Sequence, residues 1–158
     1  MTEIVILFST TETNGCLQNS QATETKGWPY IPGCFAIDRL PKTLPPRRPL
    51  LLVCNTAPHD HPGEHWITLF IDICGEYFDS LGEAPPNIFK LYLEKNCTSF
   101  VWNNKQLQSV ISSYCGHYVV YYSLMKCLNY SMDDITNGLT NDTALNDMIV
   151  HKFVCDGL

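Results

Sequence analysis

The apolar run from Tyr118 to Leu128 is the feature that most constrains how this chain folds. Such a run is most economically a buried helix, and we expect it to begin at or near Cys115. Before it come short segments with the pattern of strands. We expect a buried strand over Leu50 to Cys54, then a β-hairpin over His65 to Ile71 and Glu76 to Ser80 with a tight turn near Gly75. The pattern predicts an α+β fold, in which helices pack on a small sheet.

Further elements flank this centre. Pro85-Pro86 opens a helix, Thr98 to Trp102 is a short strand, and Ser131 begins a short helix with a capping-box pattern that Asn137-Gly138 would stop. Asn141 or Asp142 caps a last helix. Its apolar positions are Leu145, Met148, Ile149 and Phe153, and those of the helix after Pro86 are Ile88, Phe89, Leu91, Tyr92 and Leu93. Pro41 to Pro49 is a connector that cannot be helical. We expect a single domain over 1–158, with an irregular N-terminal arm over 1–33 and a core over about 34–155.

Composition narrows the class of protein. With 158 residues, 45% apolar and 16% charged, the chain fits one soluble globular domain. Its net charge of -6 argues against a surface built mainly to hold nucleic acid. The short basic cluster of Lys42 and Arg47-Arg48 is interpreted as a solvated loop.

The eight cysteines do not follow the pattern of a disulfide scaffold, because they are scattered and contain no C-x-x-C pair. The N-terminus has an acidic start and too short an apolar run for a signal peptide, and no stretch approaches a membrane span. These features predict a reducing intracellular compartment, with most cysteines acting as small core residues. The sequons at Asn96, Asn129 and Asn141 are then chance matches.

Four residues supply the parts of a thiol acyl-transfer site: His65, Asp79, Gln108 and Cys115, in that chain order. A cysteine attacks, a histidine moves the proton, a carboxylate orients the histidine and an amide stabilises an oxyanion. A cysteine at a helix N-terminus has a lowered pKa, because the helix dipole and unpaired N–H groups favour the thiolate.

Two neighbours and two competitors accompany this set. Trp66 can shield one side of the imidazole, and Gly116 leaves room for a substrate. Asp72 competes with Asp79, although its place in the hairpin turn favours solvation. Gln106 competes with Gln108, and spacing alone leaves both open.

A metal site is the rival interpretation. His59, Asp60 and His61 lie close to His65, and closely spaced histidines can bind zinc. Pro62-Gly63 breaks any helix that would align them, however, and we expect no distant Cys/His pair with ligand spacing. We therefore expect no metal and no cofactor that the sequence itself requires.

From about Gly33 to Lys126 the chain resembles the adenovirus-endopeptidase (adenain) group of cysteine proteases, in the clan that includes the Ulp1-type SUMO proteases. The motifs are Asn55-Thr56-Ala57 ahead of Gly63-Glu64-His65-Trp66, Tyr77-Phe78-Asp79-Ser80-Leu81-Gly82, and Gln108 to Cys115-Gly116. The segments 35–41, 105–109 and 115–118 look most like versions from Polinton/Maverick elements and adintovirus-type viruses.

The resemblance implies a papain-related core in circularly permuted order, with Cys115 as nucleophile, His65 as general base and acid, Asp79 as orienter and Gln108 as oxyanion donor. It also allows a peptide activator linked through Cys97 and a DNA cofactor, although the acidic charge departs from adenain and makes nucleic acid a doubtful partner.

The expected function is a cysteine endopeptidase that cleaves viral or transposon capsid precursors at Gly-containing sites. We expect it in the host cytoplasm or nucleus, or packaged in the virion, with protein substrates and no membrane. The alternatives are an isopeptidase that removes ubiquitin- or SUMO-like modifiers and a catalytically silent binding module.

Overall fold

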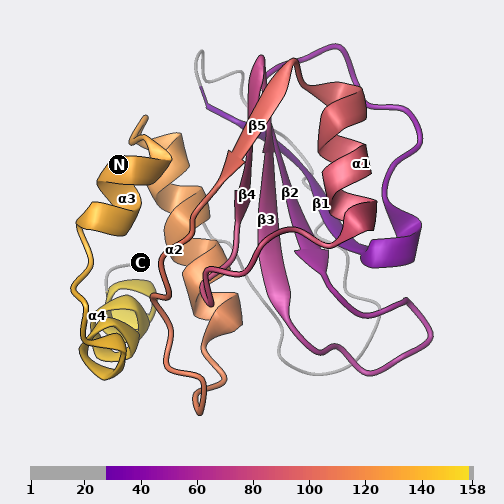
Figure 1. The fold of residues 1–158 in the computed structure, drawn as a ribbon. Coiled ribbons are helices and arrows are strands. Elements are labelled where there is room, and N and C mark those ends of the chain that lie inside the picture. The colour runs from indigo at the N-terminus through magenta and orange to yellow at the C-terminus, as the bar shows by residue number, and fades with distance from the viewer. Residues whose placement is uncertain (1–27, 157–158) are drawn as a thin grey trace.

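A five-stranded sheet forms the centre of the molecule in the computed structural model, which describes residues 28–156 (Figure 1). The strands are β1 (Tyr30–Ala36), β2 (Leu50–Asn55), β3 (Trp66–Ile71), β4 (Cys74–Phe78) and β5 (Ser99–Trp102), and they lie in this order across the sheet. The outer pairs β1–β2 and β4–β5 are parallel, whereas the inner pairs are antiparallel. A short 3-10 helix, Ile37–Arg39, follows β1.

Residues 28–156 form four α-helices around the sheet: α1 (Asn87–Asn96), α2 (Cys115–Cys127), α3 (Met132–Asn137) and α4 (Thr143–Asp156). Figure 1 shows α1 on one face of the sheet, and α2 on the other with α3 and α4 outside it. This arrangement confirms the predicted α+β fold of a small sheet flanked by helices, including the predicted start of α2 at Cys115.

The side chains of β2 alternate between the two faces of the sheet. Leu50, Leu52 and Cys54 share a core with Phe89 and Leu93 of α1, while Leu51 and Val53 pack with Val119 of α2. Because helices cover both faces, every residue of β2 is buried and the strand has a continuous apolar sequence. The sheet is thereby fixed between α1 and α2.

The predicted helix starts are confirmed. Pro86 precedes the first residue of α1. Ser131 and Asp134 form the reciprocal hydrogen bonds of a capping box at α3, which ends at Asn137 as predicted. At α4 the cap is Asp142, whose carboxylate accepts from the backbone N–H groups of Ala144 and Leu145.

Two boundaries differ from the prediction. Residues 30–33 belong to β1 and not to an irregular arm, while residues 1–27 of that arm lie outside the described residues. The hairpin turn is at Asp72 and Ile73, so Gly75 lies inside β4. A Cβ atom at Gly75 would lie 2.6 Å from the Cys97 sulfur, and this close approach of the end of α1 accounts for a glycine in the strand.

The apolar positions predicted for α4 do not form its buried face. Leu145, Met148, Ile149 and Phe153 are exposed, and Ile88 and Leu91 of α1 are exposed in the same way. The buried residues of α4 are Asn146, Asp147 and Val150. The polar ones can be buried because they are paired: Asn146 donates to the Leu107 carbonyl, and Asp147 accepts from the Tyr118 hydroxyl.

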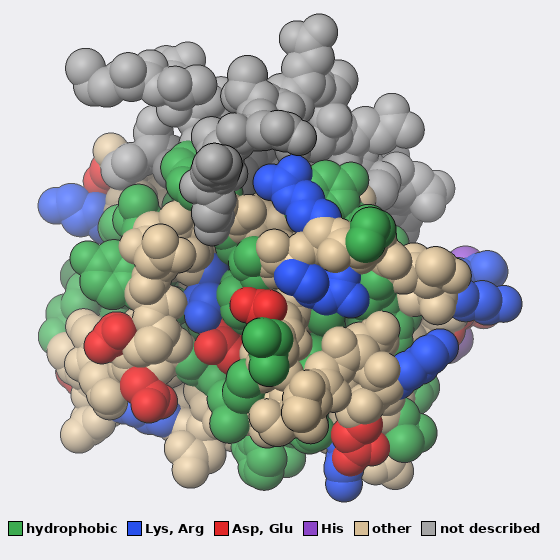
Figure 2. Space-filling view, turned by 90° about the horizontal axis from the view of Figure 1, so that it is seen from above, with side chains coloured by type: hydrophobic (Ala, Val, Ile, Leu, Met, Phe, Trp, Pro, Cys, Tyr) green, Lys and Arg blue, Asp and Glu red, His purple; other side chains and the backbone are tan. Residues whose placement is uncertain are grey.

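The cysteines are more varied in burial than predicted. Cys54 and Cys127 are buried core residues, but Cys74 and Cys155 are exposed. None of the helices in residues 28–156 is long and apolar enough to cross a membrane. Figure 2 shows the molecule from above, where Lys and Arg side chains lie interspersed with acidic, polar and apolar ones among the described residues.

Candidate active site

His65 and Asp79 meet at one end of the β3–β4 hairpin. His65 lies directly before β3 and Asp79 directly after β4, and the antiparallel pairing puts the start of one strand beside the end of the other. The His65 Nε2 atom lies 2.7 Å from Asp79 Oδ1. The Asp79 side chain is 4% exposed and that of His65 18%, so the pair is largely shielded but can be reached from one side.

The Asp79 carboxylate and its backbone are fixed by groups that the sequence analysis did not single out. The Asn103 side chain accepts from the Asp79 backbone N–H at 2.8 Å and donates to the Asp79 carbonyl at 2.5 Å. The Leu81 backbone N–H donates to Asp79 Oδ1 at 2.8 Å. Asn103 follows β5, which pairs with β4, and only that pairing indicates its role.

The loop that leads to His65 is held by Asn55. The Asn55 Oδ1 atom accepts from the backbone N–H groups of Ala57 at 2.8 Å and Glu64 at 3.3 Å. The Thr56 N–H donates to the His65 carbonyl at 2.9 Å. These bonds close the 55–64 loop on itself, and they account for the Asn-Thr-Ala motif before the histidine.

Cys115 is the first residue of α2, and its thiol interacts with the His65 ring. Burial alone would raise the pKa of this thiol. The hydrogen bond with His65, the backbone N–H groups of Trp66 and Gly116 and the charge of the imidazole outweigh burial, so the pKa lies below its ordinary value. The site therefore favours the thiolate.

The pKa of His65 is shifted in the opposite direction. Burial would lower it, but hydrogen bonds to Asp79 and Cys115 and the negative charges of both raise the pKa from 6.5 to about 9. Since Nε2 is bonded to Asp79, Nδ1 is the ring nitrogen left for Cys115. The two shifts together favour a thiolate–imidazolium pair at neutral pH.

Gln108 is buried and bonded to Ser80, the residue after Asp79, whereas its competitor Gln106 is exposed. The Gln108 Oε1 atom accepts from the Ser80 hydroxyl at 2.6 Å, and its Nε2 donates to the Ser112 carbonyl at 2.9 Å. Gln106 donates to the Gln108 backbone carbonyl. Because an amide nitrogen carries two hydrogens, Ser112 uses only one of those of Gln108.

Trp66 and Gly116 border the thiol. Trp66 is partly buried and packs on the core that contains Leu51, Val53 and Val119. Among the described residues, nothing outside the helix's own first turn lies within 4 Å of a Cβ built at Gly116. The space beside the start of α2 is therefore open.

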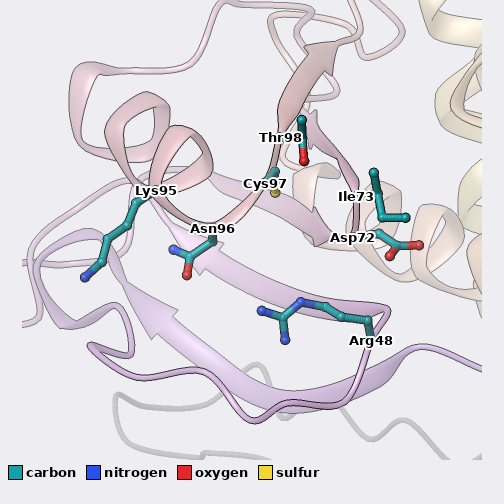
Figure 3. Close-up of a pocket in the computed structure, with 7 residues that line it drawn as sticks. All are labelled: Arg48, Asp72, Ile73, Lys95, Asn96, Cys97 and Thr98. Atoms are coloured by element: carbon teal, nitrogen blue, oxygen red, sulfur yellow. The ribbon is translucent and has the colours of Figure 1, made fainter.

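The structure places Asp72 and Cys97 at the far end of the hairpin, away from Cys115. The six residues of β3 separate the two ends by about 20 Å. Cys97 follows α1 and lines a pocket of about 500 Å³ together with Asp72, Arg48 and Lys95 (Figure 3). Burial raises the pKa of its thiol.

The histidines of the rival metal interpretation are not brought together. His59 is bonded to Asp38 at 2.6 Å and contacts Arg39, and His61 is bonded to Asp60. Both are exposed, and His65 is turned toward Asp79 instead. The bond of His59 to Asp38 ties the loop before β3 to the short 3-10 helix after β1.

The fold of the chain is similar to that of solved protease structures. Two structures of the pS273R protease of African swine fever virus (ASFV) match with TM-scores of 0.51 and 0.49, at 22% and 23% sequence identity. Each covers 66% of this chain, but only 41% and 44% of the viral protease chain. The chain thus has the fold of this protease while it spans less than half of that protein's length.

A third match is the SUMO protease Ulp1, solved with its catalytic cysteine oxidised to a sulfonic acid. It has a TM-score of 0.35 and 17% identity, and it covers 68% of this chain and 53% of that one. No protein-family model and no curated protein matches the chain.

Proposed function

We propose that the chain is a cysteine endopeptidase with Cys115 as nucleophile, His65 as general acid and base and Asp79 as the residue that orients the imidazole. The observation that carries this proposal is the 2.7 Å contact of His65 with buried Asp79, on a ring whose other nitrogen faces the thiol at the start of α2. The fold shared with a viral protease supports it.

In the first half-reaction the Cys115 thiolate attacks the scissile carbonyl carbon, and the carbonyl electron pair moves to its oxygen. The His65 imidazolium then gives its proton to the leaving amine as the C–N bond breaks, which leaves a thioester on Cys115. In the second half-reaction His65 takes a proton from water, which hydrolyses the thioester. Asp79 keeps the ring in the orientation that both transfers require.

The tetrahedral intermediate needs donors for its oxyanion. The backbone N–H of Cys115 at the start of α2 and the second hydrogen of the Gln108 amide would supply them. The bonds to Ser80 and Ser112 support this role, because they hold the Gln108 amide in one orientation.

The proposed substrates are capsid precursors of a virus or transposon, cleaved at Gly-containing sites in the host cell or in the virion. The open space at Gly116 supports a close approach of substrate backbone to the helix start. Glycine at the cleavage site would suit this approach, because it adds no side chain beside the thiol.

The resemblance to adenain also suggests a peptide activator linked through Cys97. The pocket at Cys97 has two cationic neighbours, Arg48 and Lys95, and could accept an acidic peptide end (Figure 3). The raised pKa of Cys97 would slow disulfide exchange with such a peptide. The interspersed charges of Figure 2 and the net charge of -6 give no support to a DNA cofactor.

The test uses the full chain and two peptide libraries, one with Gly-Gly-X and Gly-X-Gly segments and one without glycine. Cleavage of the first alone, absent in Cys115→Ala and retained in Cys74→Ser, is the expected result. A ubiquitin-like vinyl-sulfone probe that labels Cys115 while both libraries stay intact would indicate a deconjugating enzyme. If neither library is cut and no probe labels Cys115, the chain is a binding module and the proposal fails.

A further inference from the structure

Three metal-binding side chains converge where α4 packs against α2. They are His117, in the first turn of α2, and His151 and Cys155 on α4. His151 and Cys155 are four residues apart, so they lie on the same side of their helix. Their donor atoms and that of His117 all lie within 4.8 Å of one another.

The distances in this cluster are those of ligands around a tetrahedral zinc ion. His151 Nδ1 lies 3.4 Å from His117 Nε2 and 3.6 Å from Cys155 Sγ. With Zn–N bonds of about 2.0–2.1 Å and a Zn–S bond of about 2.3 Å, tetrahedral angles give N···N separations of about 3.4 Å and N···S separations of about 3.6 Å. Both observed distances therefore fit ligands of one tetrahedral ion, and the third pair, His117 and Cys155, lies within 4.8 Å.

Hydrogen bonding accounts for the same geometry less well. A nitrogen–nitrogen separation of 3.4 Å is longer than the range of about 2.7–3.2 Å found for N–H···O hydrogen bonds in proteins. A single Nδ1 atom of His151 would also have to serve both His117 and Cys155. A cation that accepts a lone pair from each group removes this conflict.

The surroundings hold the two imidazoles in place. The Tyr114 ring packs edge-on against His117 at 5.1 Å between centroids and tilts against His151 at 5.3 Å. His117 is half-buried, whereas His151 and Cys155 are exposed, so an ion can enter from solvent. The arrangement is thus partly formed before any ion binds.

We propose that His117, His151 and Cys155 bind Zn²⁺, with water in the fourth position, and that the ion ties α4 to the helix that begins at Cys115. As the Zn–S bond forms, the Cys155 thiol loses its proton to solvent. None of the three ligands belongs to the proposed catalytic group, and the proposal does not depend on that group, although His117 lies two residues after Cys115. The sequence places only His151 and Cys155 near each other, contrary to the expectation that no distant Cys/His pair has ligand spacing, and 34 residues separate His117 from His151.

Cobalt spectroscopy on the Cys115→Ala full chain tests the proposal, since this background removes the other thiol–imidazole pair. We expect one Co²⁺ per chain, with ligand-field bands of tetrahedral cobalt and a thiolate-to-cobalt charge-transfer band that Zn²⁺ abolishes. Adding Cys155→Ser should remove the charge-transfer band and weaken Zn²⁺ binding by more than about 100-fold, since even outer partners of a metal site account for 10–100-fold.

The controls are Cys74→Ser and His61→Ala in the same background, because both side chains are exposed and lie outside the cluster. Both should keep the full cobalt spectrum. Zn²⁺ should raise the thermal unfolding midpoint of Cys115→Ala but not that of Cys115→Ala/Cys155→Ser. A Cys115→Ala spectrum without the charge-transfer band, or one that Cys155→Ser leaves unchanged, would overturn the proposal.

Discussion

The two ends of the β3–β4 hairpin each present a half-buried thiol, but the thiols differ in their ionisation. At one end Cys115 faces the imidazole of His65, and its pKa is lowered. At the other end the Asp72 backbone N–H and the charge of Arg48 favour the Cys97 thiolate, but burial outweighs them and the pKa of Cys97 is raised. Burial opposes the thiolate at both ends, so the partner and not the depth decides which sulfur is reactive.

The reactive thiol and the surface pocket lie at opposite ends of the hairpin. The pocket of about 500 Å³ lies at the Cys97 end, where the thiol is poorly nucleophilic. The Cys115 end has a ring, a carboxylate and a helix start in contact instead. A hollow in the surface is therefore a weaker indication of chemistry in this molecule than an imidazole bonded to a buried acid.

Removing either thiol should produce the largest contrast. Cys115→Ala should reduce kcat/KM for a cleaved peptide by about 10⁴-fold or more, since no other group can form the thioester. Cys97→Ala should leave kcat/KM within about twofold, because it touches none of the reacting groups. Steady-state cleavage assays on both variants measure this, and an equal loss in the two would remove the distinction between the ends.

The two glutamines give the next contrast. Gln108→Ala should lower kcat by about 10²- to 10³-fold through the loss of an oxyanion donor. Gln106→Ala should change kcat little, because its side chain is exposed and only donates to a backbone carbonyl. Measurement of kcat for both variants with one peptide substrate decides which glutamine is the oxyanion donor. A larger loss of kcat in Gln106→Ala would assign that role to Gln106.

The dependence of kcat/KM on pH tests the role of His65, the imidazole partner that Cys97 lacks. In the native chain kcat/KM should rise as Cys115 ionises, below the ordinary range of a thiol, and fall as the pH passes about 9, where His65 loses its proton. Asp79→Asn removes the interaction that raises the pKa of His65. Its basic limb should move to lower pH, with a fall in kcat/KM of roughly 10²-fold.

The same shift has a consequence for stability. Because the pKa of His65 is raised in the folded chain, its contribution is complete below about pH 6.5 and is lost as the pH rises through about 9. The free energies of unfolding of the native chain and of Asp79→Asn, measured by denaturant titration, should therefore converge above pH 9. A native profile with no basic limb, or one that Asp79→Asn leaves in place, would contradict the assignment.

Two glycines give the smallest contrast. Gly75→Ala should destabilise the fold by about 1–3 kcal/mol, since its Cβ would lie 2.6 Å from the Cys97 sulfur. Gly116→Ala should change the free energy of unfolding by less than about 0.5 kcal/mol, because its Cβ meets open space, but it should impair cleavage. Denaturant titrations measure both. Partial recovery in Gly75→Ala/Cys97→Ala would show that the clash is with Cys97.

Local patterns in the sequence were sufficient for much of the fold. The continuous apolar runs of β2 and α2 could be predicted because burial leaves its mark within a few residues, and the start of α3 because its capping box is local. The chemical types of His65, Asp79 and Cys115 suggested a site, and the hairpin brings the first two together at 2.7 Å.

Features that depend on distant partners could not be predicted in this way. Asn103 positions Asp79 only because β5 pairs with β4, and Asn146 is buried on α4 only because the Leu107 carbonyl accepts its hydrogen bond. The apolar positions of α4 predicted the wrong buried face, because the face that packs inward is set by the distant partners of Asn146 and Asp147. The convergence of His117 with Cys155 follows from how α2 and α4 pack, for which no local signal exists.

The most direct test of the central claim is the alkylation rate of Cys115 and Cys97 in the same sample across pH 5 to 9, followed by mass spectrometry of each peptide. The account predicts that Cys115 reacts as a thiolate well below the ordinary thiol pKa of about 8.5 and faster than Cys97 throughout. In His65→Ala the alkylation rates of Cys115 and Cys97 should become similar. Equal rates in the native chain, or a Cys115 rate that His65→Ala does not lower, would contradict the account.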